Sequence, residues 1–310
     1  MFLCHFGVAS SDAVLRVCLQ LMMRQINNLA LDQLTTLAHG LAWLQTTPQT
    51  RLLREAVAVL CTTRGDQLPL LSIEHKIYLL EEFGCRLPYG SELLESLWLD
   101  RRDVRNWQQA GGFFVALAKA AAPVDSGDDR VPLTRHGYLE EWCMDILRQQ
   151  YKWLKTDDVT ALLAAFMRLG IYDGELLRLL GDHIQSCPES DMESWLSVWN
   201  LLADGDYLHV GLMEALLTEL RTSDVEQMST DTQLALLSFL AEAANYYHST
   251  SSIQSSDPCF DDALSAHIDK LTHALQMSAN IPPGNCFDVR HLRSSFEVVD
   301  VSSTMTVCLQ

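Results

Sequence analysis

The side chains of this sequence that could do acid–base or metal chemistry do not have the spacings that such chemistry needs. His267 and His273 stand six positions apart on one expected helix, whereas two histidines that bind one metal from a helix are four apart. The acidic pairs lie in a loop or at helix starts, where the helix dipole favours acids without any catalysis; they are Asp128–Asp129, Asp157–Asp158 and Asp261–Asp262. The motifs of zinc proteases, serine hydrolases, P-loops, dinucleotide-binding folds and EF-hands are absent from the sequence. We therefore expect a protein that is not an enzyme and that has no cofactor and no metal site.

One stretch has the composition of an RNA-binding surface. From Arg101 to Lys155 nine basic residues stand against seven acidic ones, with tryptophan and tyrosine interleaved. Guanidinium groups and aromatic rings together can pair with phosphates and stack on unpaired bases. Alternatively, the tryptophans belong to the core and the arginine stems cover them. The candidate RNA-contacting residues are Arg101, Arg102, Arg105, Trp107, Arg148, Tyr151, Lys152 and Lys155.

The charge of the whole chain favours protein partners over nucleic acid. A formal net charge of -18 and a pI near 4.8 oppose broad capture of phosphate. Between Lys155 and Leu240 there are 15 acidic and 4 basic residues, which suits either a solvated face that keeps the protein soluble or a docking surface for a basic protein. The candidate partner-binding residues there are Asp191, Glu193, Asp204 and Asp206.

The elements that must position these residues are helices. Apolar residues recur with the 3.6-residue period from Ser11 to Met277, which predicts an all-α fold. One apolar pattern is written twice, 83 positions apart: Leu79–Phe83 with Tyr89–Leu97, and Leu162–Phe166 with Tyr172–Leu180. A repeated helix-turn-helix unit must stack on its neighbours to bury its apolar face. We therefore predict an α-solenoid of about six antiparallel helix-turn-helix repeats.

The repeat pattern also predicts the domain organisation. The helical-repeat domain is expected over residues 1–278, with loops near 122–136 and 248–259, and an extended tail over 279–310. In the tail an alternating pattern of valines predicts a single strand that pairs with a partner, or else a disordered tail. Its candidate partner-binding residues are Val299, Val301 and Val307.

Two local patterns predict details of the repeats. Thr156 is the expected N-cap of a helix that ends at Gly170. Tyr89, Tyr172 and Tyr207 recur at the turn between helices, where we expect them to wedge between neighbouring repeats.

Cysteine usage and the first residues bear on the compartment. The nine cysteines are odd in number, widely spaced and without a C-x-x-C pair, which is typical of free thiols in a reducing compartment. Up to Leu31 the only acid is Asp12, beside Arg16 and Arg24, which suits either a degenerate mitochondrial presequence or an ordinary first helix. No apolar run is long enough to cross a bilayer, so we expect no membrane association.

The segment from Thr156 to Leu177, TDDVTALLAAFMRLGIYDGELL, resembles a known group of repeats. It is similar to the helical repeats of organellar RNA-metabolism proteins, namely the FAST-kinase-like, RAP-domain and octotricopeptide group, whose units read L-L-x-A-F-x-x-L-G-x-x-D-x-x-L. The segment from Ser72 to Leu97 resembles them less closely. The resemblance implies a mitochondrial or plastid setting and membership of a ribonucleoprotein assembly.

These observations lead to one hypothesis and one alternative. The hypothesis is a non-catalytic scaffold subunit of a mitochondrial RNA-processing, RNA-editing or mitoribosomal assembly, located in the matrix. It would mainly bind other protein subunits and would contact RNA only secondarily. The alternative is a cytoplasmic HEAT-like adaptor that binds a basic protein and no RNA.

Overall fold

The structure is a computed structural model that describes residues 13–42, 44, 46–84, 87–121, 137–188, 190–220, 223 and 228–251. All regular elements in these ranges are helices, so the all-α prediction is confirmed for this part of the chain. The α-helices are α1 (Ala13–Gln25), α2 (Leu31–Ala42), α3 (Pro48–Thr63), α4 (Ile73–Phe83), α5 (Gly90–Leu99), α6 (Trp107–Ala121), α7 (Gly137–Gln150), α8 (Thr156–Leu169), α9 (Gly174–Ser186), α10 (Met192–Asp204), α11 (Val210–Leu220) and α12 (Thr230–Ser251). The short 3₁₀ helices are η2 (Ile26–Asn28), η3 (Gly65–Leu70), η5 (Arg101–Asp103) and η6 (Tyr151–Trp153).

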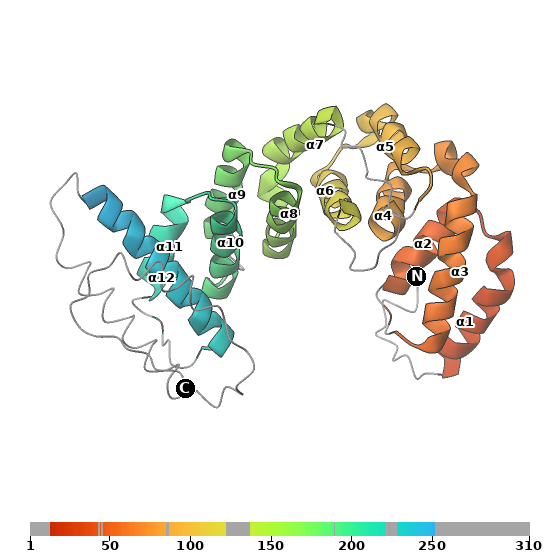
Figure 1. Ribbon diagram of the computed structural model, residues 1–310, viewed down its shortest axis with the longest axis horizontal. Coiled ribbons are helices and arrows are strands. Elements are labelled where there is room, and N and C mark those ends of the chain that lie inside the picture. The colour runs from red at the N-terminus through yellow and green to blue at the C-terminus, as the bar shows by residue number, and fades with distance from the viewer. Residues whose placement is uncertain are drawn as a thin grey trace. The chain divides into compact units, whose positions relative to one another are not determined.

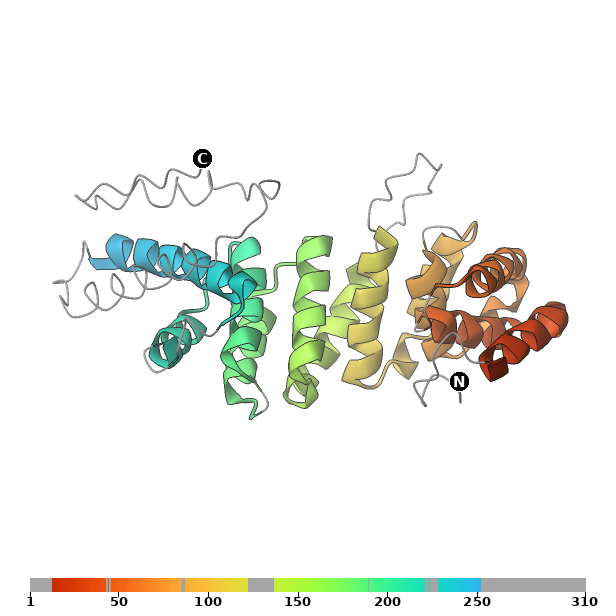
Figure 2. The ribbon, with the colours of Figure 1, turned by 90° about the horizontal axis from the view of Figure 1, so that it is seen from below.

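The chain divides into two compact units, Met1–His183 and Ile184–Gln310, and the division falls within α9. In the first unit the helices α2, α4, α6 and α8 lie side by side in chain order, each packed on the next (Figure 1, Figure 2). The helices between them in sequence, α3, α5 and α7, pack against this row from outside it (Figure 1).

The core of the first unit runs along the row of helices. The apolar residues of α8 form one buried stripe, Val159, Leu162, Leu163, Phe166 and Leu169, and Leu80 of α4 is fully buried as well. Phe114 of α6 meets Phe166 of α8 edge to face with the ring centroids 5.0 Å apart. At the other face of α6, α4 comes so close that a Cβ atom at Gly84 would lie 2.8 Å from the Cβ atom of Ala120. Small residues are therefore required where α4 ends.

A single pattern connects each outer helix to the next helix of the row. After α1, α3, α5 and α7 the chain makes a 3₁₀ turn and then one extended apolar residue, whose N–H donates back to the first or a middle carbonyl of that turn. The extended residues are Leu29, Leu71, Val104 and Leu154. The last three are buried, so each fastens its turn to the core and leaves the turn's polar residues outside.

The ends of α8 and α12 test the local predictions. Gly170 follows α8 with a left-handed φ of 65°, and the N–H of Ile171 donates to the carbonyl of Phe166 at 2.9 Å, as expected for a glycine helix end. The predicted N-cap is displaced by one residue, because the helix begins at Thr156 itself and Asp158 accepts the Lys155 N–H at 3.0 Å. The helix α12 continues to Ser251, so the loop expected near 248–259 does not begin at 248.

The predicted wedge of turn tyrosines is right at one position and wrong at another. The hydroxyl of Tyr89 donates to the carbonyl of Cys61, which ties the turn before α5 to α3. Tyr172, in contrast, is 61% exposed, because the preceding residue of this extended turn, Ile171, is the one that is buried. Tyr207 is half-buried.

The second unit has its own core around α10. The helices α11 and α12 both pack on α10, and Trp199 of α10 lies edge to face with Phe239 of α12, with the ring centroids 5.2 Å apart. The buried indole N–H of Trp199 donates to Glu242 at 2.9 Å. Burial of Glu242 raises the pKa of its carboxyl group, an effect that this hydrogen bond partly offsets.

Candidate functional site

The candidate RNA-contacting residues gather on two of the 3₁₀ turns of the first unit. Arg101 and Arg102 belong to η5, which follows α5, and Tyr151 and Lys152 belong to η6, which follows α7. The extended residues after these turns are buried, whereas Arg102 and Lys152 on the turns themselves are exposed.

Gln150 joins the two turns. Its side-chain oxygen accepts the backbone N–H of Trp107 at 3.1 Å, and its side-chain nitrogen donates to the carbonyl of Arg105 at 3.0 Å. This double bridge holds the segment after η5 against the last residue before η6. Two basic segments that are about fifty positions apart in the sequence therefore meet at one edge, which we call the η5–η6 edge and define as residues 101–107 and 150–155.

The cations of the η5–η6 edge differ in how they are engaged. The guanidinium of Arg101 lies 3.7 Å from the ring centroid of Trp98 and donates to that residue's carbonyl at 3.0 Å. Arg105 pairs with Asp103 at 3.3 Å, but both side chains are more than half exposed, so water and salt weaken the pair. Arg102, Arg105 and Lys152 therefore remain accessible to a phosphate.

The aromatic candidates lie partly under the surface. Trp107, the first residue of α6, is half-buried, and Tyr151 is half-buried with its ring edge to face against His183 at 5.8 Å. The Nζ of Lys152 lies 5.8 Å from the centroid of the Tyr151 ring. His183 in turn donates from Nε2 to the carbonyl of Leu154 at 2.8 Å, which fastens η6 to α9.

Trp153 is a functional candidate that the sequence-based selection left out. It occupies the last position of η6, beside Lys152, and 73% of it is exposed. An indole this exposed on a basic turn can stack on a base or on a guanidinium. Its position between Lys152 and Lys155 is the sequence signal that could have identified it.

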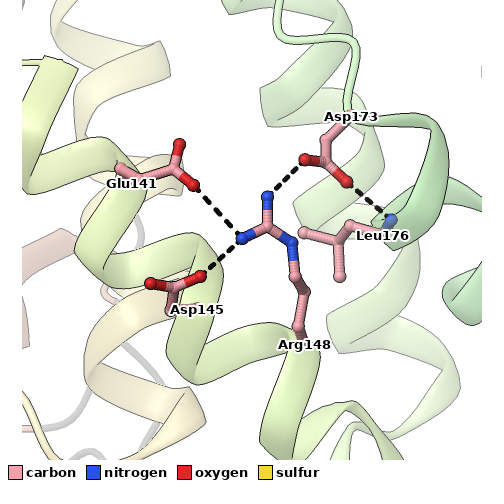
Figure 3. Close-up of polar contacts among 5 residues, drawn as sticks. All are labelled: Glu141, Asp145, Arg148, Asp173 and Leu176. Carbon is pink, nitrogen blue, oxygen red and sulfur yellow. Dashed lines mark hydrogen bonds and ion pairs between the residues drawn. The ribbon is translucent and has the colours of Figure 1, made fainter.

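Arg148 differs from the other basic candidates because carboxylates surround its guanidinium. Its Nη1 donates to Glu141 at 3.3 Å and to Asp145 at 2.5 Å, both from α7, while its Nη2 donates to Asp173 (Figure 3). Asp173 also accepts the N–H of Leu176 at 2.7 Å and so caps the start of α9. This arrangement connects α7 to α9.

The electrostatics of this cluster follow from its hydrogen bonds. The hydrogen bond to Asp173 raises the pKa of Arg148 against the opposing effect of burial, and Glu141 raises it further. Burial alone would raise the pKa of Asp173, but the hydrogen bonds from Arg148 and Leu176 and the charge of Arg148 lower it overall. Both groups are thus charged at neutral pH, and the geometry gives Arg148 a structural task that the sequence did not indicate.

The local charge of the η5–η6 edge departs from that of the chain. Residues 101–107 and 150–155 carry five basic side chains and one acidic side chain, a surplus of positive charge in a chain whose net charge is -18. Lys155 is exposed at the end of this edge, with its backbone N–H held by Asp158. A local surplus of this kind can bind a few phosphates without general attraction to nucleic acid.

The acidic candidates of the second unit do not form one patch. Asp191 caps α10 by accepting the Ser194 N–H at 2.9 Å, and Glu193 accepts the hydroxyl of Thr232 at 3.0 Å. Asp204 and Asp206 lie at the other end of α10, a helix of 13 residues that is about 20 Å long. The hydrogen bonds from Ser194 lower the pKa of Asp191, as expected for a capping carboxylate. Val299, Val301 and Val307 lie outside the described residues.

Among the described residues, none of the helices combines the length and the apolar character needed to cross a bilayer. No protein-family model matches the chain, and no curated protein matches it.

Proposed function

We propose that this protein is a non-catalytic α-solenoid scaffold of a mitochondrial ribonucleoprotein assembly, which holds protein subunits and contacts single-stranded RNA through the η5–η6 edge. The observation that carries the RNA contact is the bridge from Gln150 to Arg105 and Trp107. It brings Arg102, Arg105, Lys152 and the exposed Trp153 to one edge, so that phosphates and a base could be bound together.

The packing of the first unit supports the solenoid part of the proposal. The helices α2, α4, α6 and α8 contact in chain order, and the same 3₁₀ turn with one extended apolar residue precedes each of them. Chain-order contacts between equivalent elements are the defining feature of repeat proteins. With α9 to α12 forming further pairs, about six antiparallel repeats would make up the chain.

The edge has the chemistry of an RNA contact that is weak and strongly dependent on salt. About four cations are accessible there, so at most about four phosphates would be neutralised, and the slope of log K against log salt for a single strand would be near -3. Stacking on Trp153 would add about 1–3 kcal/mol. Affinity in the assembly would therefore come mainly from protein contacts, which suits a scaffold.

Charge reversal of the edge tests the RNA contact directly. We would measure the binding of a fluorescent single-stranded RNA to the purified chain, then reverse four charges with Arg102→Glu, Arg105→Glu, Lys152→Glu and Lys155→Glu. The expected result is a loss of affinity at least tenfold larger than in a control variant with the same change in net charge. The control carries Arg24→Glu, Arg51→Glu, Arg168→Glu and Arg178→Glu, which lie outside the edge.

The comparison of the edge variant with the control variant decides whether RNA binds at the η5–η6 edge. If they bind the RNA equally, the η5–η6 edge is not the contact, and the effect is one of net charge alone. Affinity purification from cells with a tagged chain tests the scaffold itself, because subunits and RNA of a mitochondrial assembly should co-purify. A tagged copy found exclusively in the cytosol, together with a basic protein and no RNA, would support the HEAT-like adaptor in place of this proposal.

A further inference from the structure

A histidine and two glutamates from neighbouring helices converge where the ends of α2 and α4 meet. The Nδ1 atom of His39, in the last turn of α2, lies 3.9 Å from Oε2 of Glu81 and 4.0 Å from Oε1 of Glu82, both in the last turn of α4. One nitrogen and two carboxylate oxygens thus lie within 4.8 Å of one another. The side chains of His39, Glu81 and Glu82 are 22%, 16% and 22% exposed, so the cluster is largely shielded but in contact with solvent.

The packing around His39 fixes the direction of its ring. The imidazole stacks on Tyr78 with the ring centroids 4.1 Å apart and the planes 12° from parallel. Tyr78 stands three and four positions before the two glutamates, so all three side chains lie on one face of α4. The same face that supports the imidazole therefore presents the carboxylates to its Nδ1 atom.

The two oxygens of Glu81 have separate partners. Lys119 of α6 pairs with Oε1, while Oε2 faces His39. A lysine that holds one carboxylate oxygen leaves the other free to bind a cation and fixes its position.

We propose that His39 Nδ1, Glu81 Oε2 and Glu82 Oε1 bind one divalent transition-metal cation, for which Zn²⁺ is the best match, and that the ion clamps α2 to α4. One imidazole with two carboxylates is a ligand set that Zn²⁺ accepts, whereas Mg²⁺ and Ca²⁺ prefer oxygen ligands alone. The fourth position would be filled by a water molecule, which the partial exposure of the three side chains allows.

The distances fit such a site after a small adjustment. With metal–ligand bonds of about 2.0–2.2 Å, neighbouring ligands of a tetrahedral Zn²⁺ are about 3.3–3.6 Å apart. The observed separations of 3.9 and 4.0 Å exceed that by only a few tenths of an ångström. The third separation, between the two carboxylate oxygens, is at most 4.8 Å, so binding would require the two glutamate side chains to move closer together.

The test is metal binding by the purified full-length chain after dialysis against a chelator. Titration calorimetry with Zn²⁺ should give saturable binding of one ion, and saturating Zn²⁺ should raise the melting temperature. Two variants, His39→Gln and Glu82→Gln, should each weaken binding at least tenfold and abolish the shift in melting temperature. Mg²⁺ should bind at least tenfold more weakly than Zn²⁺.

The control for this test is His75→Gln. His75 also connects α2 to α4, since its Nε2 lies 3.0 Å from the Thr36 hydroxyl, but it is not one of the proposed ligands. This variant should retain wild-type Zn²⁺ affinity, and circular dichroism should establish that all variants are folded. No saturable binding to the wild-type chain, or equal binding by His75→Gln and the two ligand variants, would overturn the proposal. Because RNA binding has no part in these measurements, the proposal stands or falls independently of the proposed function.

Discussion

Replacing Asp173 should separate two contributions that one carboxylate makes to the start of α9. One oxygen of Asp173 accepts the Leu176 N–H at 2.7 Å, and the other accepts a hydrogen bond from Arg148 (Figure 3). Asparagine caps a helix about as well as aspartate, so Asp173→Asn keeps the first contribution and loses the charge, whereas Asp173→Ala loses both.

The two contributions have comparable magnitudes. A capping side chain is worth about 1 kcal/mol, and a charge-assisted hydrogen bond at a half-buried site about 1–2 kcal/mol. We therefore expect Asp173→Asn to lower the free energy of unfolding by about 1 kcal/mol and Asp173→Ala by about 2–3 kcal/mol. The exposed pair Arg51–Glu55 of α3 supplies a control, because Arg51→Met should cost about 0.5 kcal/mol or less.

The pH dependence of stability identifies the contribution made by the charge of Asp173. Because hydrogen bonds from Arg148 and Leu176 outweigh burial, the pKa of Asp173 is lower in the folded than in the unfolded chain. Its charge therefore stabilises the fold fully above the unfolded pKa near 3.9, and this stabilisation is lost as the pH falls through the folded pKa. The difference between wild type and Asp173→Asn should be constant above about pH 5 and should shrink below about pH 4.

Two measurements separate the capping contribution of Asp173 from the contribution of its charge. Urea unfolding followed by circular dichroism gives the free energies, and hydrogen exchange of the first amides of α9 reports the local opening. Equal stability of Asp173→Asn and Asp173→Ala would refute the capping role. A gap between wild type and Asp173→Asn that is as large at pH 3 as at pH 6 would refute the charge–charge explanation, as would strict additivity of Asp173→Asn with Arg148→Met.

Three further substitutions test other parts of the fold by urea unfolding. Gly170→Ala should lower the free energy of unfolding by about 1 kcal/mol, because the φ of 65° at this position strains any side chain. Gly111→Ala, within α6 and with open space at the Cβ position, should instead raise it by about 0.5 kcal/mol. Equal effects of the two substitutions would contradict the backbone angle at Gly170. Asp100→Ala should destabilise the fold by about 3 kcal/mol, because it leaves the fully buried Lys76 without its partner. Lys76→Met should stay within about 1 kcal/mol of wild type, because Asp100 is 40% exposed and can be solvated. A larger loss of stability for Lys76→Met than for Asp100→Ala would be inconsistent with this burial. Phe166→Ala should cost about 3–5 kcal/mol through loss of its contact with α6, and a cost below 1 kcal/mol would mean that the aromatic contact does not form.

The helices could be predicted from the sequence because their signals are local. The stripe of α8 needs only the 3.6-residue period to be recognised, and Gly170 needs only its position after that stripe. The exposure of Tyr172 could not be predicted in the same way. Its recurrence suggested a buried wedge, but the extended backbone puts alternate residues on opposite sides, and Ile171 takes the buried side.

The candidate site could be predicted only in part, since its geometry depends on contacts between distant segments. The basic and aromatic composition of residues 101–155 selected residues that the structure places on or beside η5 and η6, but nothing local distinguishes Arg148 from Lys152. Arg148 is held by Asp173, which is 25 positions away and belongs to another helix. The bridge from Gln150 to Arg105 likewise depends on how α6 and α7 pack, which no local pattern encodes.

The repeat itself contains information that motif searches do not use. The apolar pattern of α4 recurs 83 positions later in α8, and α6 lies between these two helices in the packed row. About half of the 83-position displacement therefore separates equivalent positions of neighbouring helices in the row. His39 precedes Glu81 by 42 positions, and Glu81 precedes Lys119 by 38, so the three residues occupy similar places on α2, α4 and α6. A search for ligands spaced by four residues on one helix cannot find such a cluster, whereas a search at the repeat length brings His39, Glu81 and Lys119 together from the amino-acid sequence alone.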